Sequence, residues 1–172
     1  VVKYMNVTAK YILASVDQSG HLERAYLRFL GDGLLFIFPM ASFNQTKMKT
    51  VTEPILKELA EMSARFRAYL SQDPPPGLVH MPMSLGVGIS FGPLVPIRIK
   101  SKTLVITQDD YIGPAINLAS RLQHVARNGG CVAADHLYEA VLKYDRDASV
   151  LFNTLFPNKY QVDLQGIGEV SV

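Results

Sequence analysis

The triplet Gly31-Asp32-Gly33 constrains the fold most, because it separates two short apolar runs, residues 24–29 and 34–38. Asp-Gly supplies the positive φ angles that a tight antiparallel turn needs. The two runs are therefore predicted to form a β-hairpin. An exposed turn residue would account for Asp32; the alternative is a carboxylate that binds Mg²⁺ together with the phosphates of a nucleotide.

Apolar residues recur every three to four positions in residues 50–71 and 114–126, which predicts two amphipathic helices. Residues 1–17 have a similar pattern, and Asp135 can cap a further helix that ends near Tyr144. These four segments are the expected helices.

Residues 83–91 alternate apolar and small side chains, as in a strand packed on one face. The glycines within it, Gly86 and Gly88, would let another backbone approach closely. Gly92-Pro93 then predicts a turn, after which residues 94–99 are expected to run back. Further strands are expected at residues 104–106, at residues 131–134 and, as a pair, within residues 149–172.

This order predicts an α+β fold, a mixed sheet with helices mainly on one face. No linker interrupts the chain, so residues 1–172 are expected to form one domain. Hydrophobic residues make up 48% of the 172 residues and charged residues 19%, which excludes a disordered chain. The net charge of +2 gives no reason to expect a nucleic-acid partner.

The single cysteine, Cys131, fits a reducing compartment, and an internal disulfide is excluded. No apolar run approaches the roughly 18–20 residues needed to cross a membrane, so no membrane contact is expected. No secretory signal is recognisable either. A cytoplasmic protein is the expectation.

Asn117 and Arg121 are four residues apart in the second predicted helix, so they share one helical face. A solvated polar stripe would explain them. Because Leu118, Leu122 and Val125 already define the buried side, a clamp for a sugar and a phosphate is the alternative.

Residues 28–38, 85–93 and 110–123 resemble, in this order, three successive blocks of the class III nucleotidyl cyclase catalytic domain. Residues 162–170 resemble the closing strand pair of that family. The resemblance covers nearly the whole chain. It implies a ferredoxin-like α+β fold that works as a homodimer, with the active site between the protomers.

The resemblance also implies roles for five residues. Asp32 matches one of two aspartates that hold two Mg²⁺ or Mn²⁺ ions. Asn117 and Arg121 match the pair that orients the ribose and stabilises the transition state across the interface. Arg28 and Asp110 match the positions that recognise the base.

The sequence departs from the family pattern in three places. The other metal-binding aspartate would lie before Val1, so the first strand is expected to be absent from this sequence. Gln165 and Ile167 stand where the closing strands usually supply a lysine. Arg28 replaces the lysine found in many adenylate cyclases.

Arg28 bears on the substrate, because arginine only donates hydrogen bonds and an ionised Asp110 only accepts them. Adenine, cytosine and uracil offer a matching acceptor and donor side by side, whereas guanine presents the opposite order. Arginine is longer than lysine and leaves less room for a purine. A pyrimidine is therefore a candidate, as in the bacterial cyclases of antiphage defence.

The expected function is conversion of ATP, UTP or CTP, but not GTP, to a 3′,5′-cyclic nucleotide and pyrophosphate. Such an enzyme is a phosphorus-oxygen lyase that makes a second messenger. The alternative is a catalytically inactive cyclase-homology domain that serves dimerisation or nucleotide sensing.

Overall fold

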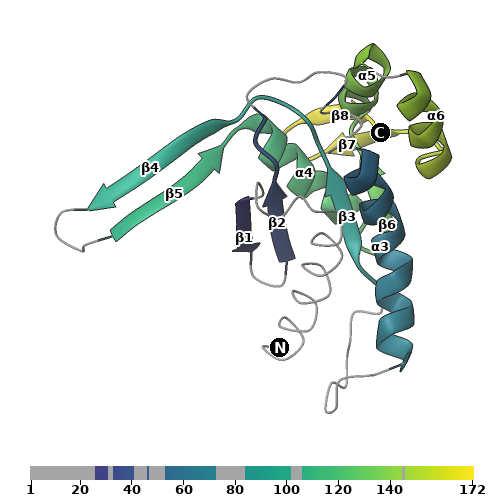
Figure 1. The fold of residues 1–172 in the computed structure, drawn as a ribbon, viewed down its shortest axis with the longest axis horizontal. Coiled ribbons are helices and arrows are strands. Elements are labelled where there is room, and N and C mark those ends of the chain that lie inside the picture. The colour runs from purple at the N-terminus through teal and green to yellow at the C-terminus, as the bar shows by residue number, and fades with distance from the viewer. Residues whose placement is uncertain are drawn as a thin grey trace.

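The computed structural model describes residues 26–30, 33–40, 46, 53–72, 84–101, 106–144 and 146–172. Figure 1 shows the fold. In chain order the elements are β1 (Tyr26–Leu30), β2 (Gly33–Ile37), α3 (Glu53–Gln72), β3 (Gly86–Ile89), β4 (Val95–Ser101), β5 (Ile106–Ile112), α4 (Pro114–Val125), β6 (Gly130–Ala133), α5 (Asp135–Tyr144), α6 (Arg146–Leu155), β7 (Gln161–Leu164) and β8 (Gly168–Ser171).

The predicted hairpin at the start of the described chain is confirmed. β1 and β2 pair antiparallel, with Arg28 opposite Leu35 and Leu30 opposite Gly33. Asp32, in the turn between these strands, lies outside the described residues, and so does the helix predicted for residues 1–17.

The described part of the chain is a mixed α+β structure, as expected. Its strands pair in twos rather than in one continuous sheet: β1 with β2, β3 with β6, β4 with β5, and β7 with β8. Only β3 and β6 run parallel. Leu34 and Phe36 of β2 pack with Leu85, next to β3, around the buried Met62 of α3. Helix α3 therefore packs against both the β1–β2 hairpin and the parallel pair of β3 and β6.

The glycines of β3 let α4 lie directly against the strand, as the sequence predicted. A Cβ atom at Gly88 would lie 2.2 Å from the carbonyl oxygen of Ala119 and 2.2 Å from the backbone nitrogen of Gln123. At Gly86, it would lie 2.4 Å from the carbonyl oxygen of Ala126. No side chain larger than hydrogen fits at these contacts, so the two glycines set the position of α4.

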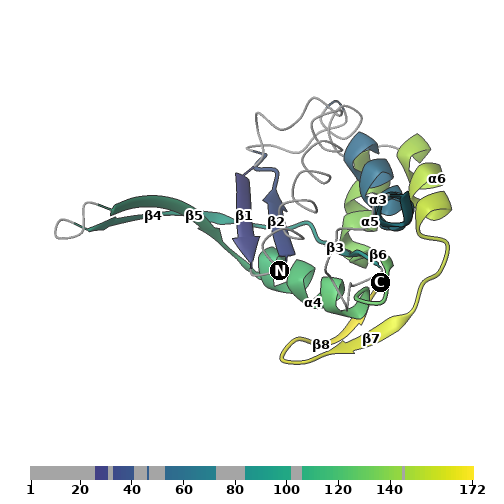
Figure 2. The same ribbon diagram turned by 90° about the horizontal axis from the view of Figure 1, so that it is seen from below.

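The main hydrophobic cluster joins α3, β6, α5 and α6, which lie together in Figures 1 and 2. It contains the buried side chains of Leu56, Ala133, Leu137, Val141 and Phe152. A second cluster, with Leu122 of α4 and Leu164 of β7, packs the last hairpin against α4.

The prediction that residues 149–172 form only a pair of strands was wrong for the first part of this segment. Residues 146–155 form α6 instead, and the two strands follow it as β7 and β8. Ala148 and Phe152, four residues apart, are buried, whereas Val150 is 67% exposed. The apolar run therefore has the helical period, which its aromatic and β-branched residues concealed.

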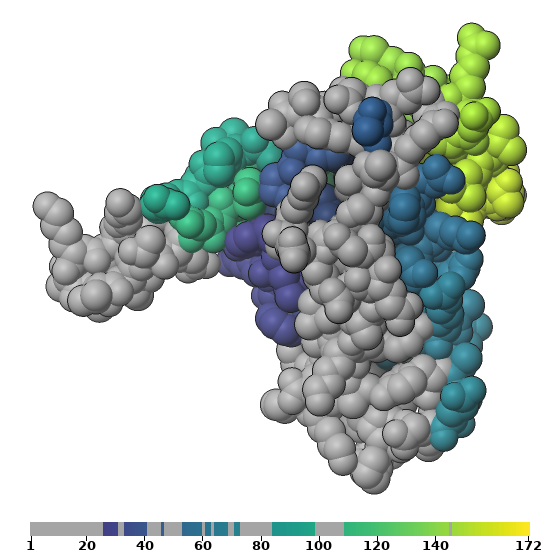
Figure 3. Space-filling model, viewed as in Figure 1, coloured from purple at the N-terminus to yellow at the C-terminus, as the bar shows by residue number. Residues whose placement is uncertain are grey.

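β4 and β5 form a long antiparallel hairpin, called the arm below, that projects from the rest of the molecule (Figures 1 and 2). Figure 3 shows the root of the arm, in teal and green, beside the purple β1–β2 hairpin. Its pairing begins with Val95 opposite Ile112. The strand expected at residues 94–99 is present as β4, but it does not run back along β3, because β4 pairs with β5. Of the strand expected at 104–106, residues 104 and 105 lie outside the described residues, and Ile106 begins β5, which ends at Ile112. Both strands stand away from the core, so burial imposes no apolar alternation on them.

Within the part of the chain that the structure describes, no helix is both long enough and apolar enough to span a membrane.

Candidate functional site

The candidate site is built around Asp110, a buried carboxylate at the root of the arm. Only 7% of Asp110 is exposed. Arg28 on β1 donates a hydrogen bond from Nη1 to its Oδ2 atom, and the two side chains form an ion pair. Oδ1 accepts hydrogen bonds from the backbone N–H of Tyr111, at 2.8 Å, and from the hydroxyl of Tyr26, at 3.0 Å. Both carboxylate oxygens are therefore engaged.

These contacts keep Asp110 ionised. The backbone N–H of Tyr111 is the strongest influence that lowers the pKa of Asp110, and the Tyr26 hydroxyl and the Arg28 guanidinium lower it further, against the opposing effect of burial. An ionised carboxylate has no hydrogen to donate. Asp110 can therefore act toward a ligand only as a hydrogen-bond acceptor.

Tyr26 and Arg28 reach the same carboxylate because they are two residues apart in β1, on the same side of the strand. The Tyr26 ring also packs edge-on against Tyr111, with ring centroids 5.3 Å apart. Burial, followed by the hydrogen bond to Asp110, raises the pKa of Tyr26. The sequence predicted Arg28 and Asp110 but missed both tyrosines; the two-residue spacing from Arg28 was the signal that could have identified Tyr26.

Asn117 and Arg121 lie on α4, as predicted, and both are exposed. Gly113 and Pro114 join this helix directly to β5, with proline in its first turn, where its missing N–H costs nothing. Neither Asn117 nor Arg121 takes part in the contacts around Asp110. Their exposure within the described part of the chain makes both side chains accessible to a ligand or a second molecule.

The predicted metal ligand Asp32 lies outside the described residues. Among the residues that the structure does describe, no three His, Cys, Asp or Glu side chains gather closely enough to hold a metal ion. The prediction of a two-metal site therefore depends on Asp32 and is not tested by this structure.

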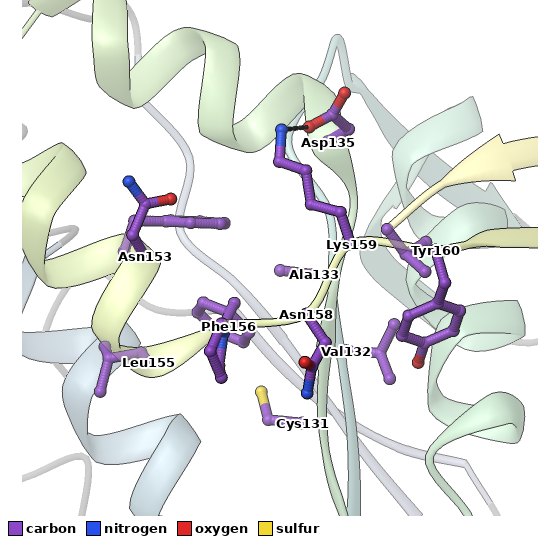
Figure 4. A pocket seen from close by; sticks show the side chains of 13 residues that line it. Cys131, Val132, Ala133, Asp135, Asn153, Leu155, Phe156, Asn158, Lys159 and Tyr160 are labelled. Atoms are coloured by element: carbon purple, nitrogen blue, oxygen red, sulfur yellow. Dashed lines mark hydrogen bonds and ion pairs between the residues drawn. The ribbon is translucent and has the colours of Figure 1, made fainter.

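A separate cavity of about 180 Å³ lies between β6 and the segment after α6 (Figure 4). The ammonium group of Lys159 donates a 2.9 Å hydrogen bond to Asp135 beside it and lies 4.2 Å from the centre of the Tyr138 ring. Cys131 also lines the cavity, and burial raises the pKa of its thiol to about 12. The thiol stays protonated at neutral pH and is a poor nucleophile. The cavity includes none of the predicted site residues.

No protein-family model matches the sequence, and neither the curated proteins nor the solved structures contain a match to it.

Proposed function

We propose that this chain is a class III nucleotidyl cyclase domain. It converts a nucleoside triphosphate to the 3′,5′-cyclic monophosphate and releases pyrophosphate, in the cytoplasm. The order of the sequence blocks supports the family, and the ferredoxin-like fold and the homodimer belong to the proposal.

The observation that carries this proposal is the contact between Arg28 and Asp110. These residues lie 82 positions apart, and their roles in base recognition were proposed from the sequence alone. Two charged groups on a surface often form an ion pair that serves stability alone. Here the carboxylate of Asp110 is only 7% exposed and accepts hydrogen bonds from three donors. Such a fixed acceptor beside a partly exposed guanidinium suits recognition of a planar, polar ligand.

The geometry also favours particular bases. Arg28 and Asp110 place a donor and an acceptor next to each other, which matches neighbouring acceptor and donor atoms on the edges of adenine, cytosine and uracil. In the orientation that fits adenine and cytosine, guanine would present its carbonyl oxygen toward the acceptor and its N–H toward the donor, so it is disfavoured. Uracil offers the matching order through its N3–H and O2 atoms. The length of Arg28 favours a pyrimidine over adenine, and a pyrimidine cyclase would fit a role in antiphage defence.

Asn117 and Arg121 supply the second half of the proposed site. An amide at Asn117 orients the ribose, and the guanidinium of Arg121 stabilises the charge that develops at the α-phosphate. Because neither contacts the Arg28–Asp110 pair of its own chain, we assign them to the nucleotide held by a second copy. The exposed apolar residues at the root of the arm, Val95 and Ile112, are 57% and 53% exposed and offer a surface for that copy.

In the proposed reaction, the ribose 3′-hydroxyl gives its proton to solvent water and its oxygen forms a bond to the α-phosphorus. The bond from the α-phosphorus to the bridging oxygen breaks, and the electron pair leaves with pyrophosphate. Mg²⁺ or Mn²⁺, when bound at Asp32, would lower the pKa of the hydroxyl and neutralise the phosphates. The residues of this chain bind the base, orient the ribose and stabilise the transition state.

The test is incubation of the protein with ATP, GTP, CTP or UTP in the presence of Mn²⁺, followed by separation of the products and mass spectrometry. We expect a cyclic nucleotide from a base other than guanine. A cyclic product from GTP alone would contradict the assigned base contacts. If no triphosphate gives a cyclic product, the proposed cyclase activity is contradicted, and the alternative of a catalytically inactive cyclase-homology domain is favoured.

A further inference from the structure

Tyr26 occupies a central place in the candidate site that the sequence did not predict. Its hydroxyl lies 3.0 Å from Oδ1 of Asp110 and 3.2 Å from the carbonyl oxygen of Asp109. Its ring packs edge-on against Tyr111, with an angle of 70° between the ring planes. The side chain is therefore held between β1 and the root of the arm, with its hydroxyl directed at the buried carboxylate.

The hydrogen bonds around Asp110 determine which of its oxygens a ligand can use. An ionised carboxylate accepts about four hydrogen bonds, two at each oxygen. At Oδ1, the N–H of Tyr111 and the hydroxyl of Tyr26 fill both positions. At Oδ2, Arg28 takes one position. The remaining acceptor position lies on Oδ2, next to the guanidinium.

A different contact between Arg28 and Asp110, which forms without any ligand, would compete with base binding. Arginine and a carboxylate form their strongest contact when two parallel N–H groups face both oxygens. Such a two-fold contact would turn the edge of the Arg28 guanidinium toward both oxygens, so that its remaining N–H groups and the open position on Oδ2 would no longer point together toward a base. It requires Oδ1 to be available to Arg28, and the Tyr26 hydroxyl occupies that oxygen.

We propose that Tyr26 is a positioning residue for base recognition, which keeps Arg28 and Asp110 in an open, one-bond contact and so leaves Oδ2 for an N–H of the base. This inference rests on the proposed function and extends it to a residue outside the matched base positions. Without the hydroxyl, Arg28 can also reach Oδ1, and the donor of Arg28 and the acceptor of Asp110 are no longer aligned for the base.

The experiment measures binding to 3′-deoxynucleoside triphosphates, which lack the attacking hydroxyl and therefore cannot react. Titration calorimetry in the presence of Mn²⁺ gives the dissociation constant for each of the four bases with the wild type and with Tyr26→Phe. We expect Tyr26→Phe to weaken the preferred nucleotide on the order of five- to tenfold, the effect of one hydrogen bond to a charged group. The affinity for the guanine nucleotide should not change.

Phenylalanine keeps the ring against Tyr111, so the fold is expected to be retained; an unchanged thermal unfolding temperature checks this. Tyr160→Phe is the matched control, since Tyr160 is 46% exposed and lines the separate cavity. It should leave every dissociation constant unchanged.

A double-mutant cycle tests whether Tyr26 acts through Asp110. In an Asp110→Ala background, Tyr26→Phe should cause no further loss of affinity. If Tyr26→Phe discriminates between bases as the wild type does, or weakens binding equally with and without Asp110, the inference is wrong while the proposed function stands. If the wild type binds none of the nucleotides, the proposed function fails and this inference fails with it.

Discussion

The guanidinium of Arg28 on β1 donates a hydrogen bond to the carboxylate of Asp110 on β5, a residue 82 positions further along the chain. This contact, together with the Tyr26–Asp110 hydrogen bond, ties the first hairpin to the root of the arm. The pair that we propose for base recognition is therefore also a structural link. A change in the position of the arm would change the geometry of this pair.

The low pKa of Asp110 predicts how stability depends on pH. A carboxyl group whose pKa is lowered by folding stabilises the folded state above its ordinary pKa of 3.8, and this contribution is lost as the pH falls through the lower folded value. The wild type should therefore be more stable than Asp110→Asn at pH 7, and the difference should shrink below pH 3.8. Urea unfolding at a series of pH values measures this.

Glu139→Gln is a suitable control for that series, because Glu139 is exposed on α5. Its stability relative to the wild type should vary little over the same pH range. An Asp110→Asn difference that stays constant down to the lowest pH would show that the charge of Asp110 contributes nothing to stability.

Arg121→Ala should remove activity without affecting the fold. The side chain is exposed, so its loss leaves no cavity. If it stabilises the transition state, kcat should fall on the order of 100- to 1,000-fold, with a smaller effect on KM. Steady-state kinetics beside Arg127→Ala, an exposed arginine just beyond α4, checks this. Equal losses in both variants would refute a specific role for Arg121.

Gly88→Ala should displace α4 from β3. The added Cβ atom would meet backbone atoms of Ala119 and Gln123 at 2.2 Å, and backbone cannot move aside as a flexible side chain can. We expect a loss of roughly 3 kcal/mol or more in the free energy of unfolding. At Gly33, the nearest atom to an added Cβ is 3.5 Å away, so Gly33→Ala should change stability by no more than about 1 kcal/mol. Similar losses at the two positions would contradict the close packing of α4.

Val95→Asp should weaken the proposed dimer. Val95 is 57% exposed at the root of the arm, and an aspartate placed in an apolar interface would be buried without a partner. We expect the dissociation constant of the dimer to rise at least roughly tenfold, as measured by analytical ultracentrifugation. Val150→Asp, at a position 67% exposed on α6, is the control and should dimerise normally. A dimer equally stable in both variants would place the interface elsewhere.

The sequence predicted the helices and strands that bury one face against the core and expose the other. The helix of residues 50–71 corresponds to α3, where Met62 and Phe66 are buried, and the hairpin around Gly31-Asp32-Gly33 is formed by β1 and β2. Strands were expected near β4 and β5, but their pairing into an arm was not predicted, because both strands stand away from the core and carry polar residues such as Arg98 and Asp109, which pair across the hairpin.

The sequence identified only part of the candidate site. Arg28 and Asp110 were identified from a motif, and the structure brings them into contact. Tyr26 was missed, because a tyrosine in an apolar strand is usually a packing residue, and only the tertiary fold places its hydroxyl against Asp110. Contacts over more than 80 positions leave no periodic signal in a single sequence.

The most direct test of the central claim mixes two inactive variants. If one copy supplies Arg28 and Asp110 and the other supplies Asn117 and Arg121, then Asp110→Ala and Arg121→Ala each disable every site in their own homodimers. In a mixed dimer, one of the two sites has all its residues intact.

After subunit exchange, an equal mixture of the two variants should regain roughly a quarter of the wild-type rate of cyclic nucleotide formation, because half of the dimers are mixed and each has one intact site. Each variant alone should remain nearly inactive. A mixture as inactive as its components, from an active wild type, would contradict a site shared between two copies.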